Sequence, residues 1–158
     1  ALDPDDENRM DRGLRLEAEA REDFEKRTGK KVTCVGVCVS ELNPRIINSP
    51  DGLIKEKPRS KFYTEALEIK CLSPARHLEA VIENVVPKEF ESQVAQYFVV
   101  NDKLERLYVL FYDPRIVSVP YHVITVERSS IEEKVQAFTD FQLEELNEID
   151  KIVDRLSF

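Results

Sequence analysis

Two short stretches carry most of the information in this chain: NSPDGLI, residues 48–54, and LEIKC, residues 67–71. The Pro-Asp-Gly tripeptide of the first predicts a turn, because proline presets its own φ and glycine accepts a positive φ. The second has the composition of a strand, yet Glu68 and Lys70 lie among its apolar residues, and Glu68 follows Asp51 by 17 positions. Charged side chains are rare in the middle of a core strand unless they are paired or hold a metal. These charges therefore need a chemical explanation.

The length and charge of the chain limit the classes of protein to consider. Its 158 residues predict one domain, residues 1–158, with a sizeable core. The formal net charge of −8 argues against a protein that coats nucleic acid non-specifically. An acidic surplus is compatible with carboxylates that hold divalent cations, whose charge the formal count omits. Apolar runs of membrane length are absent from the sequence, so we expect no association with a membrane.

The three cysteines indicate a reducing compartment. Cys34, Cys38 and Cys71 form no even framework, and the first residues do not resemble a signal peptide, so we expect a cytoplasmic protein. The CVGVC stretch, residues 34–38, could belong to a metal site, but on a strand it would place two thiols on one face with few other ligands nearby. We interpret the three cysteines as buried structural thiols.

The order of helix and strand signals predicts an α/β fold. Helix formers precede Gly29, a natural C-cap, and prolines start two later helical segments. β-Branched and aromatic residues after Gly29 predict an antiparallel set of strands, and apolar residues near helical spacing predict a long amphipathic terminal helix. We expect a mixed central sheet flanked by helices, with helices over residues 6–28, 73–85, 87–100 and 129–158 and strands within residues 32–40, 44–52, 62–73, 106–113 and 121–127.

A shared site would explain the charges at the two stretches. Residues two apart on a strand point to the same side, so Glu68 and Lys70 share a face, and Asp51 on a neighbouring strand can converge with them. Two carboxylates and the carbonyl between Glu68 and Lys70 are hard oxygen ligands suited to Mg²⁺. A lysine beside them can orient a water or offset charge on a phosphate, which is the chemistry of phosphodiester hydrolysis. The alternatives are an ordinary turn aspartate and a solvated strand face.

Beyond these two stretches, several segments occur in an order that resembles a known family. SPDGLI and LEIKC look like the PD-(D/E)xK nuclease motif, and the other matching segments are GLRLEAEAREDFEKRTG (13–29), ESQVAQY (91–97), FYDPR (111–115) and HVITVER (122–128). Together they resemble the lambda exonuclease and YqaJ-type viral recombinase family. The resemblance covers most of the chain and implies a restriction-endonuclease-like core.

The resemblance also implies roles for individual residues of the site. Asp51 and Glu68 would ligate metal ions together with the backbone carbonyl of Ile69, and Lys70 would position or activate the attacking water. Glu17 would hold a second metal ion, directly or through water; without the resemblance it is one more solvated charge on an acidic helix. The expected cofactor is Mg²⁺, with Mn²⁺ as a substitute, in a site for two ions.

Three further residues come from the same resemblance. Gln93, as a catalytic residue, and Tyr97, as a substrate-binding residue, fit a Q-x-x-x-Y pattern on one helix face, although Gln96 competes with Gln93 for the glutamine position. Ser49 falls where the family places a hydroxyl near a substrate phosphate. We expect His77 to be a surface residue and His122 a satisfied strand histidine, neither of them catalytic.

The implied activity is that of a metal-dependent, ATP-independent phage-type deoxyribonuclease. Such an enzyme acts as a 5′-to-3′ exonuclease on the ends of linear double-stranded DNA during recombination. It works as a ring-shaped homo-oligomer with a single-strand annealing protein as partner, in the cytoplasm of the host cell if a phage encodes it. The alternatives are a structure-specific or restriction-like endonuclease and a non-catalytic recombination scaffold.

Two features depart from the family pattern. The chain begins almost at the first helix, so an N-terminal arginine and hydroxyl that grip the 5′ phosphate in the family cannot be assigned here, and we expect weaker recognition of that phosphate. The segment KEKPRSK, residues 55–61, forms a longer basic turn between the Asp51 and Glu68 strands. It could contact the DNA backbone or serve only solubility.

Overall fold

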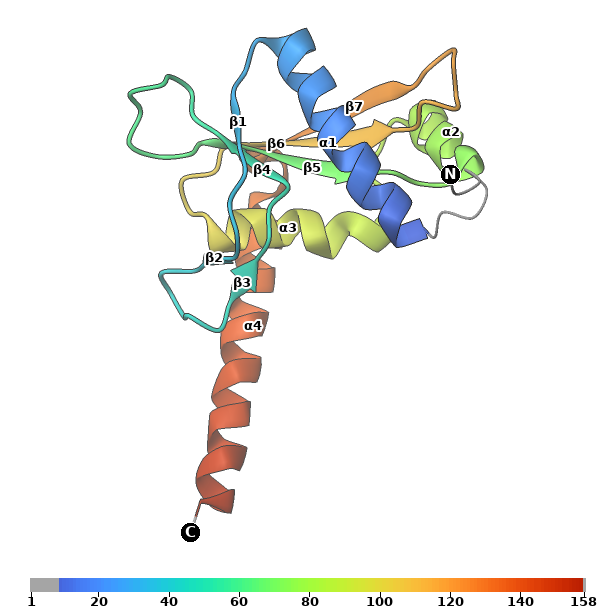
Figure 1. Ribbon diagram of the computed structural model, residues 1–158. Coiled ribbons are helices and arrows are strands. Elements are labelled where there is room, and N and C mark those ends of the chain that lie inside the picture. The colour runs from blue at the N-terminus through green and yellow to red at the C-terminus, as the bar shows by residue number, and fades with distance from the viewer. Residues whose placement is uncertain (1–8, 158) are drawn as a thin grey trace.

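The computed structural model describes residues 9–157 and confirms the expected α/β class (Figure 1). A five-stranded sheet has the order β1-β4-β5-β6-β7, in which only β5 and β6 run parallel. Its strands are β1 (Val32–Thr33), β4 (Gly52–Ile54), β5 (Glu65–Lys70), β6 (Arg106–Tyr112) and β7 (Tyr121–Glu127).

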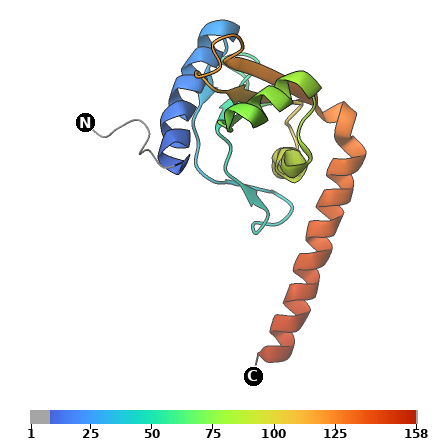
Figure 2. The same ribbon diagram turned by 90° about the vertical axis from the view of Figure 1, so that its right-hand side faces the viewer.

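Helices cover both faces of this sheet (Figures 1 and 2). On one face, α1 (Arg9–Thr28) buries Leu16, Ala20 and Phe24 against a cluster that includes Leu67 and Leu110. The opposite face packs against the remaining helices, which are α2 (Pro74–Glu83), the 3₁₀ turn η2 (Lys88–Phe90), α3 (Glu91–Val100) and the first turns of α4 (Arg128–Leu156). Burial on both faces explains why β6, after Arg106, is an almost continuous apolar run.

The first predicted strand, over residues 32–40, is wrong in its extent. The chain pairs with β4 only through β1 and then leaves the sheet, and β2 (Cys38–Val39) forms a separate two-stranded ribbon with β3 (Ile47–Asn48). The cysteines consequently do not share a strand face. Cys34 is exposed, and Cys38 and Cys71 are only half-buried, so the expectation of buried thiols is wrong.

The turn predicted at Pro-Asp-Gly is also wrong in its physical basis. Gly52 does not have a positive φ; it is the first residue of β4. A Cβ at this position would lie 2.1 Å from Cγ1 of Val32 on the neighbouring strand. The glycine is therefore required by the close approach of β1, and it places Asp51 at a bend that leads directly into the sheet.

The terminal helix is longer than its contact with the core. Of the apolar residues that predict its buried face, Val135 is buried, whereas Phe141, Ile149 and Val153 are exposed. The helix bends at Ile131, where φ is −130° and ψ is 16°, and its last turns project from the domain (Figures 1 and 2). Arg45, in the turn between β2 and β3, forms a two-pronged ion pair with Asp150 of this helix at 2.9 Å.

Within residues 9–157, the structure contains no helix that is both long and apolar enough to cross a membrane.

Candidate active site

Strand register brings the two diagnostic stretches together. Gly52 pairs with Leu67 in the antiparallel β4–β5 ladder, so Asp51 lies at the level of Glu68 on the adjacent strand. Glu68 and Lys70 point from β5 toward α3, as their two-residue spacing predicts, and Lys70 Nζ lies 2.7 Å from Glu68 Oε1. The sequence-predicted Asp51, Glu68 and Lys70 thus lie at one end of the central strand pair.

Asp51 is held by the backbone of the next strand. Its Oδ2 accepts a hydrogen bond of 2.7 Å from the backbone N–H of Ile69. Burial, together with the negative charges of Glu68 and Glu17, raises the pKa of Asp51 to about 7 against the lowering effect of the Ile69 bond. A carboxyl group in this position gains from any cation that offsets its charge.

Glu68 lies at the centre of a buried polar network. Its side chain is 3 % exposed, and its two oxygens contact Lys70, Gln93 Nε2 at 2.7 Å and the hydroxyl of Tyr97. Gln93 Oε1 in turn accepts a hydrogen bond of 2.6 Å from Lys70 Nζ. The amide of Gln93 therefore fixes both the carboxylate and the ammonium group, each of which would be costly to bury unpaired.

Tyr97 connects the two stretches through a single hydroxyl. This oxygen accepts a hydrogen bond of 3.2 Å from the backbone N–H of Asp51 and donates to Glu68. Burial raises the pKa of Tyr97, so the group stays a neutral donor. The residue is 2 % exposed. Its hydroxyl thus faces the site carboxylates, and its role in substrate binding stays a prediction.

The two candidate glutamines have different surroundings. Gln93 belongs to the Glu68 network, whereas Gln96 exchanges two amide hydrogen bonds of 3.0 and 2.8 Å with Gln142 of α4. Gln96 also donates to the carbonyl of Ile47 in β3 at 3.0 Å. The contacts favour Gln93 as the site residue and give Gln96 a structural position.

Helix α1 contributes Glu17 and a residue that the sequence interpretation missed. Glu17 forms an ion pair with Arg21, one turn further along the helix, and Arg21 Nε donates to the carbonyl of Asp51 at 3.2 Å. Arg21 thus ties the helix to the bend at Asp51. Its spacing of four residues from Glu17 was the available signal, because positions i and i+4 share a helix face.

The donor set matches a divalent cation only in part. Asp51, Glu68 and the carbonyl of Ile69 are hard oxygen donors close to one another, and the raised pKa of Asp51 reflects burial first and then the proximity of other carboxylates. Across residues 9–157, however, no group of three or more His, Cys, Asp or Glu side chains is arranged to hold a metal ion. Glu17 turns toward Arg21, so the pair Asp51 and Glu68 with a backbone oxygen is the set that fits.

The remaining candidate residues lie around this centre. Ser49 is exposed, at the edge of a groove that also reaches Gln93. Burial raises the pKa of the Cys71 thiol to about 11, which keeps it a protonated neighbour of the site.

The structure contradicts the prediction for His77 and agrees with the prediction for His122. His77 is fully buried, and its Nε2 lies 2.7 Å from the carbonyl oxygen of Val119, so the expected surface position is wrong. It lies on the buried side of α2, whose amphipathic pattern was the missed signal. His122 is satisfied on its strand by Asn84 Oδ1 at 3.0 Å.

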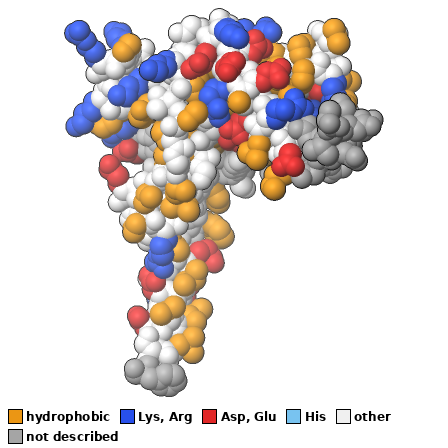
Figure 3. Space-filling view, in the orientation of Figure 1, with side chains coloured by type: hydrophobic (Ala, Val, Ile, Leu, Met, Phe, Trp, Pro, Cys, Tyr) orange, Lys and Arg blue, Asp and Glu red, His pale blue; other side chains and the backbone are white. Residues whose placement is uncertain are grey.

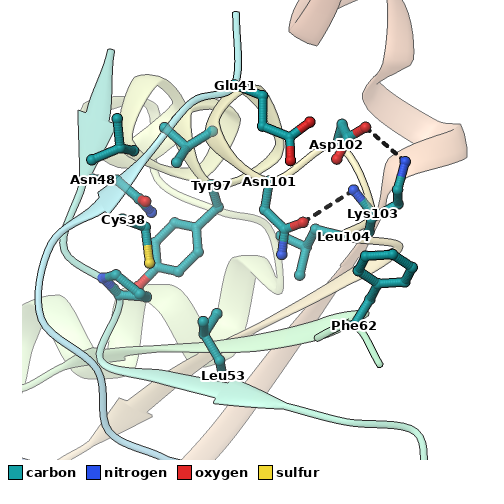
Figure 4. A pocket seen from close by; sticks show the side chains of 13 residues that line it. Cys38, Glu41, Asn48, Leu53, Phe62, Tyr97, Asn101, Asp102, Lys103 and Leu104 are labelled. Carbon is teal, nitrogen blue, oxygen red and sulfur yellow. Dashed lines mark hydrogen bonds and ion pairs between the residues drawn. The ribbon is translucent and has the colours of Figure 1, made fainter. Parts of the chain in front are cut away.

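Another pocket is lined by Tyr97 together with residues of β2, β3 and the end of α3 (Figure 4). It has a volume of about 210 Å³, and the tyrosine ring faces Cys38 and Leu53 in it. Its rim carries Asp102 and Lys103, which pair with each other at 2.8 Å. None of Asp51, Glu68 and Lys70 lines this pocket, so it is separate from the candidate catalytic centre.

Positive charge gathers at the other end of the sheet from the site. The loop between β4 and β5 carries Lys55, Lys57, Arg59 and Lys61, and Figure 3 shows this group of basic side chains on the surface. This basic loop lies at the opposite end of the β4–β5 hairpin from Asp51.

Comparisons with known proteins agree with the fold and the motifs. The structure resembles the alkaline exonuclease LHK-Exo from Laribacter hongkongensis, with 26% identity, a TM-score of 0.70, and coverage of 96% of this chain and 78% of that one. LHK-Exo in complex with dAMP gives a TM-score of 0.68 at 26% identity, over 94% of this chain and 75% of the other. Comparison with curated protein sequences gave no match. The model of the YqaJ-like viral recombinase domain matches residues 1–103, and the chain belongs to this family.

Proposed function

We propose that this protein is a metal-dependent, ATP-independent deoxyribonuclease that degrades linear double-stranded DNA from its ends, in the 5′-to-3′ direction, during phage-type recombination. The observation that carries the proposal is the convergence of Asp51, Glu68 and Lys70 beside the buried Gln93–Tyr97 network. The similarity to an alkaline exonuclease supports an exonuclease over other nucleases built on this core.

The metal ligands would be Asp51, Glu68 and the carbonyl of Ile69, with Mg²⁺ as the ion and Mn²⁺ as its substitute. Glu17 would serve a second ion after separating from Arg21, directly or through water. A bound divalent ion lowers the pKa of a water molecule and neutralises charge on the leaving 3′ oxygen. The charge of the ion would also offset the repulsion between the carboxylates of Asp51 and Glu68.

The other residues of the site would hold the reacting groups in place. Lys70, 2.7 Å from Glu68, would orient the attacking water and offset negative charge on the scissile phosphate. Gln93 would keep the lysine Nζ aimed into the site through its 2.6 Å hydrogen bond, and Tyr97 would fix the spacing of Asp51 and Glu68. Ser49, at the open edge, would donate a hydrogen bond to a substrate phosphate.

We further propose that the enzyme works as a ring-shaped homo-oligomer in the cytoplasm, together with a single-strand annealing protein. The exposed apolar residues in the last turns of α4, from Ile149 to Leu156, support association with other chains, since contiguous apolar surface on a monomer marks an interaction site. A ring would also let an acidic chain act on DNA if basic groups such as those of the 55–61 loop face its channel.

The test is cleavage of one plasmid in two forms, linear and covalently closed, with Mg²⁺ or with EDTA. We expect nucleotides to be released from the linear form only, in the presence of Mg²⁺, with a 5′ label lost before a 3′ label. The Asp51→Asn variant is the control for contaminating nucleases. Cleavage of the closed circle would instead identify an endonuclease, and DNA binding without any cleavage would identify a non-catalytic recombination scaffold.

A further inference from the structure

A groove of about 620 Å³ leads away from the candidate active site between β3, α3 and α4. Gln93 and Tyr97 line its inner end, which makes it continuous with the Glu68 network. Ser49 lies on the same rim, and Phe138 and Phe141 of α4 form the opposite wall. Its volume falls within the range of small-molecule sites and is sufficient for a nucleotide.

The lining of this groove is uncharged. Its residues are serines, amides, aromatics and one isoleucine, although 34% of the chain is charged. Grooves that follow a phosphate backbone carry lysine and arginine. A neutral lining of amides and aromatic rings suits a nucleobase, because amides hydrogen-bond base edges and rings stack on base faces.

The two phenylalanines differ in their freedom to make such a contact. Phe138 packs against the hydrophobic core, whereas Phe141 is 56 % exposed and has no such role in holding the fold. The wall that carries Phe141 is fixed, since Gln142 next to it exchanges hydrogen bonds with Gln96 of α3. The ring is therefore an exposed aromatic surface on a rigid support, close to the site.

We infer that this groove binds one unpaired nucleobase of the strand under digestion, with Phe141 as its stacking surface, an inference that rests on the proposed nuclease function. A base inside a duplex is already stacked and paired, so the groove selects a nucleotide that has separated from its partner strand. The stacked base would place the adjacent phosphate at Ser49, Lys70 and the carboxylates. Phe141 is thus a substrate-positioning residue.

The test compares binding of two duplexes in an Asp51→Asn background, which prevents cleavage. One duplex ends in a normal 5′ nucleotide and the other in a 5′ abasic nucleotide, and affinity is measured by fluorescence anisotropy. We expect the protein with Phe141 to prefer the normal end by about tenfold, the size typical of one base–aromatic stack. Phe141→Ala and Phe141→Leu should lose the preference, and Phe141→Tyr should keep it.

Ile82→Ala is the matched control, because Ile82 is 80 % exposed on α2 and lies outside the groove. It should keep the preference, and circular dichroism should show that all variants retain the fold. An unchanged preference in Phe141→Ala, or equal affinity for both ends with Phe141 present, would overturn the inference while leaving the nuclease proposal intact. Failure of the unsubstituted protein to cleave an ordinary linear duplex would instead remove the proposed function and the inference with it.

Discussion

Replacement of Asp51 by asparagine should stabilise the metal-free protein at neutral and alkaline pH while it abolishes cleavage. Asparagine has the same shape, and its Oδ1 can accept the hydrogen bond that the backbone N–H of Ile69 donates at 2.7 Å. What it removes is a carboxylate that burial and the charges of Glu68 and Glu17 make unfavourable in the folded state.

The magnitude follows from the pKa of Asp51, which rises from 3.8 to about 7 on folding. Above the unfolded value the unfolded chain has lost this proton while the folded protein keeps it, so stability falls as the pH rises until the folded value is passed. At about 1.4 kcal/mol per pH unit the total loss is about 4 kcal/mol, an upper limit because the carboxyl group keeps some contact with water. For a chain of this size, 4 kcal/mol corresponds to about 8–16 °C in melting temperature.

The assay is urea unfolding of both proteins in EDTA at a series of pH values from 4 to 9. The advantage of Asp51→Asn should be absent near pH 4, grow up to about pH 7 and stay constant above it. Saturating Mg²⁺ should then stabilise the unsubstituted protein and not the variant, since only the former has the complete ligand set. Equal stability at pH 8, or a less stable variant there, would refute the argument that burial and the neighbouring carboxylates make an ionised Asp51 unfavourable in the metal-free site.

Three other substitutions test the remaining parts of the site. Lys70→Met should lower the single-turnover cleavage rate about 100-fold or more and change the calorimetric Mg²⁺ affinity little, because the lysine contributes to the reaction and is not a ligand; a parallel loss of metal binding would contradict that role. Tyr97→Phe should cost about 1–3 kcal/mol in urea unfolding and lower the rate as well, because Glu68 and the Asp51 N–H lose a buried partner. Gly52→Ala should lower the free energy of unfolding by about 1–3 kcal/mol. In a Val32→Ala background, where the clashing Cγ1 is absent, a double-mutant cycle should show a much smaller loss.

The parts of the fold that sequence predicts are those that local rules determine. Gly29, with a φ of 69°, ends α1 as its position indicates, and β5, β6 and β7 lie within the stretches rich in apolar and β-branched residues. The pairing of Asp51 with Glu68 and Lys70 could also be predicted, since period-two spacing sets which side chains share a face.

The parts that sequence missed depend on contacts between distant segments. Nothing local distinguishes a turn glycine from Gly52, whose requirement comes from Val32 on another strand. The ion pair between Arg45 and Asp150, 105 residues apart, likewise could not be predicted, although it links the ribbon to α4. The apolar stripe of α4 was correctly identified as amphipathic, but the pattern does not specify whether the same domain or another molecule covers it.

The strand register determines whether the catalytic chemistry is possible at all. A slip of one residue between β4 and β5 would turn Glu68 and Lys70 toward α1 and bring Leu67 and Ile69 to face α3. Two features oppose this slip. Gly52 admits Val32 only at its present position, and the Tyr97 hydroxyl can bond Asp51 and Glu68 together only when the two lie level. The residues that fix the register are therefore the ones that bring the two carboxylates into a single site, so selection for the chemistry and selection for this part of the fold act on the same contacts.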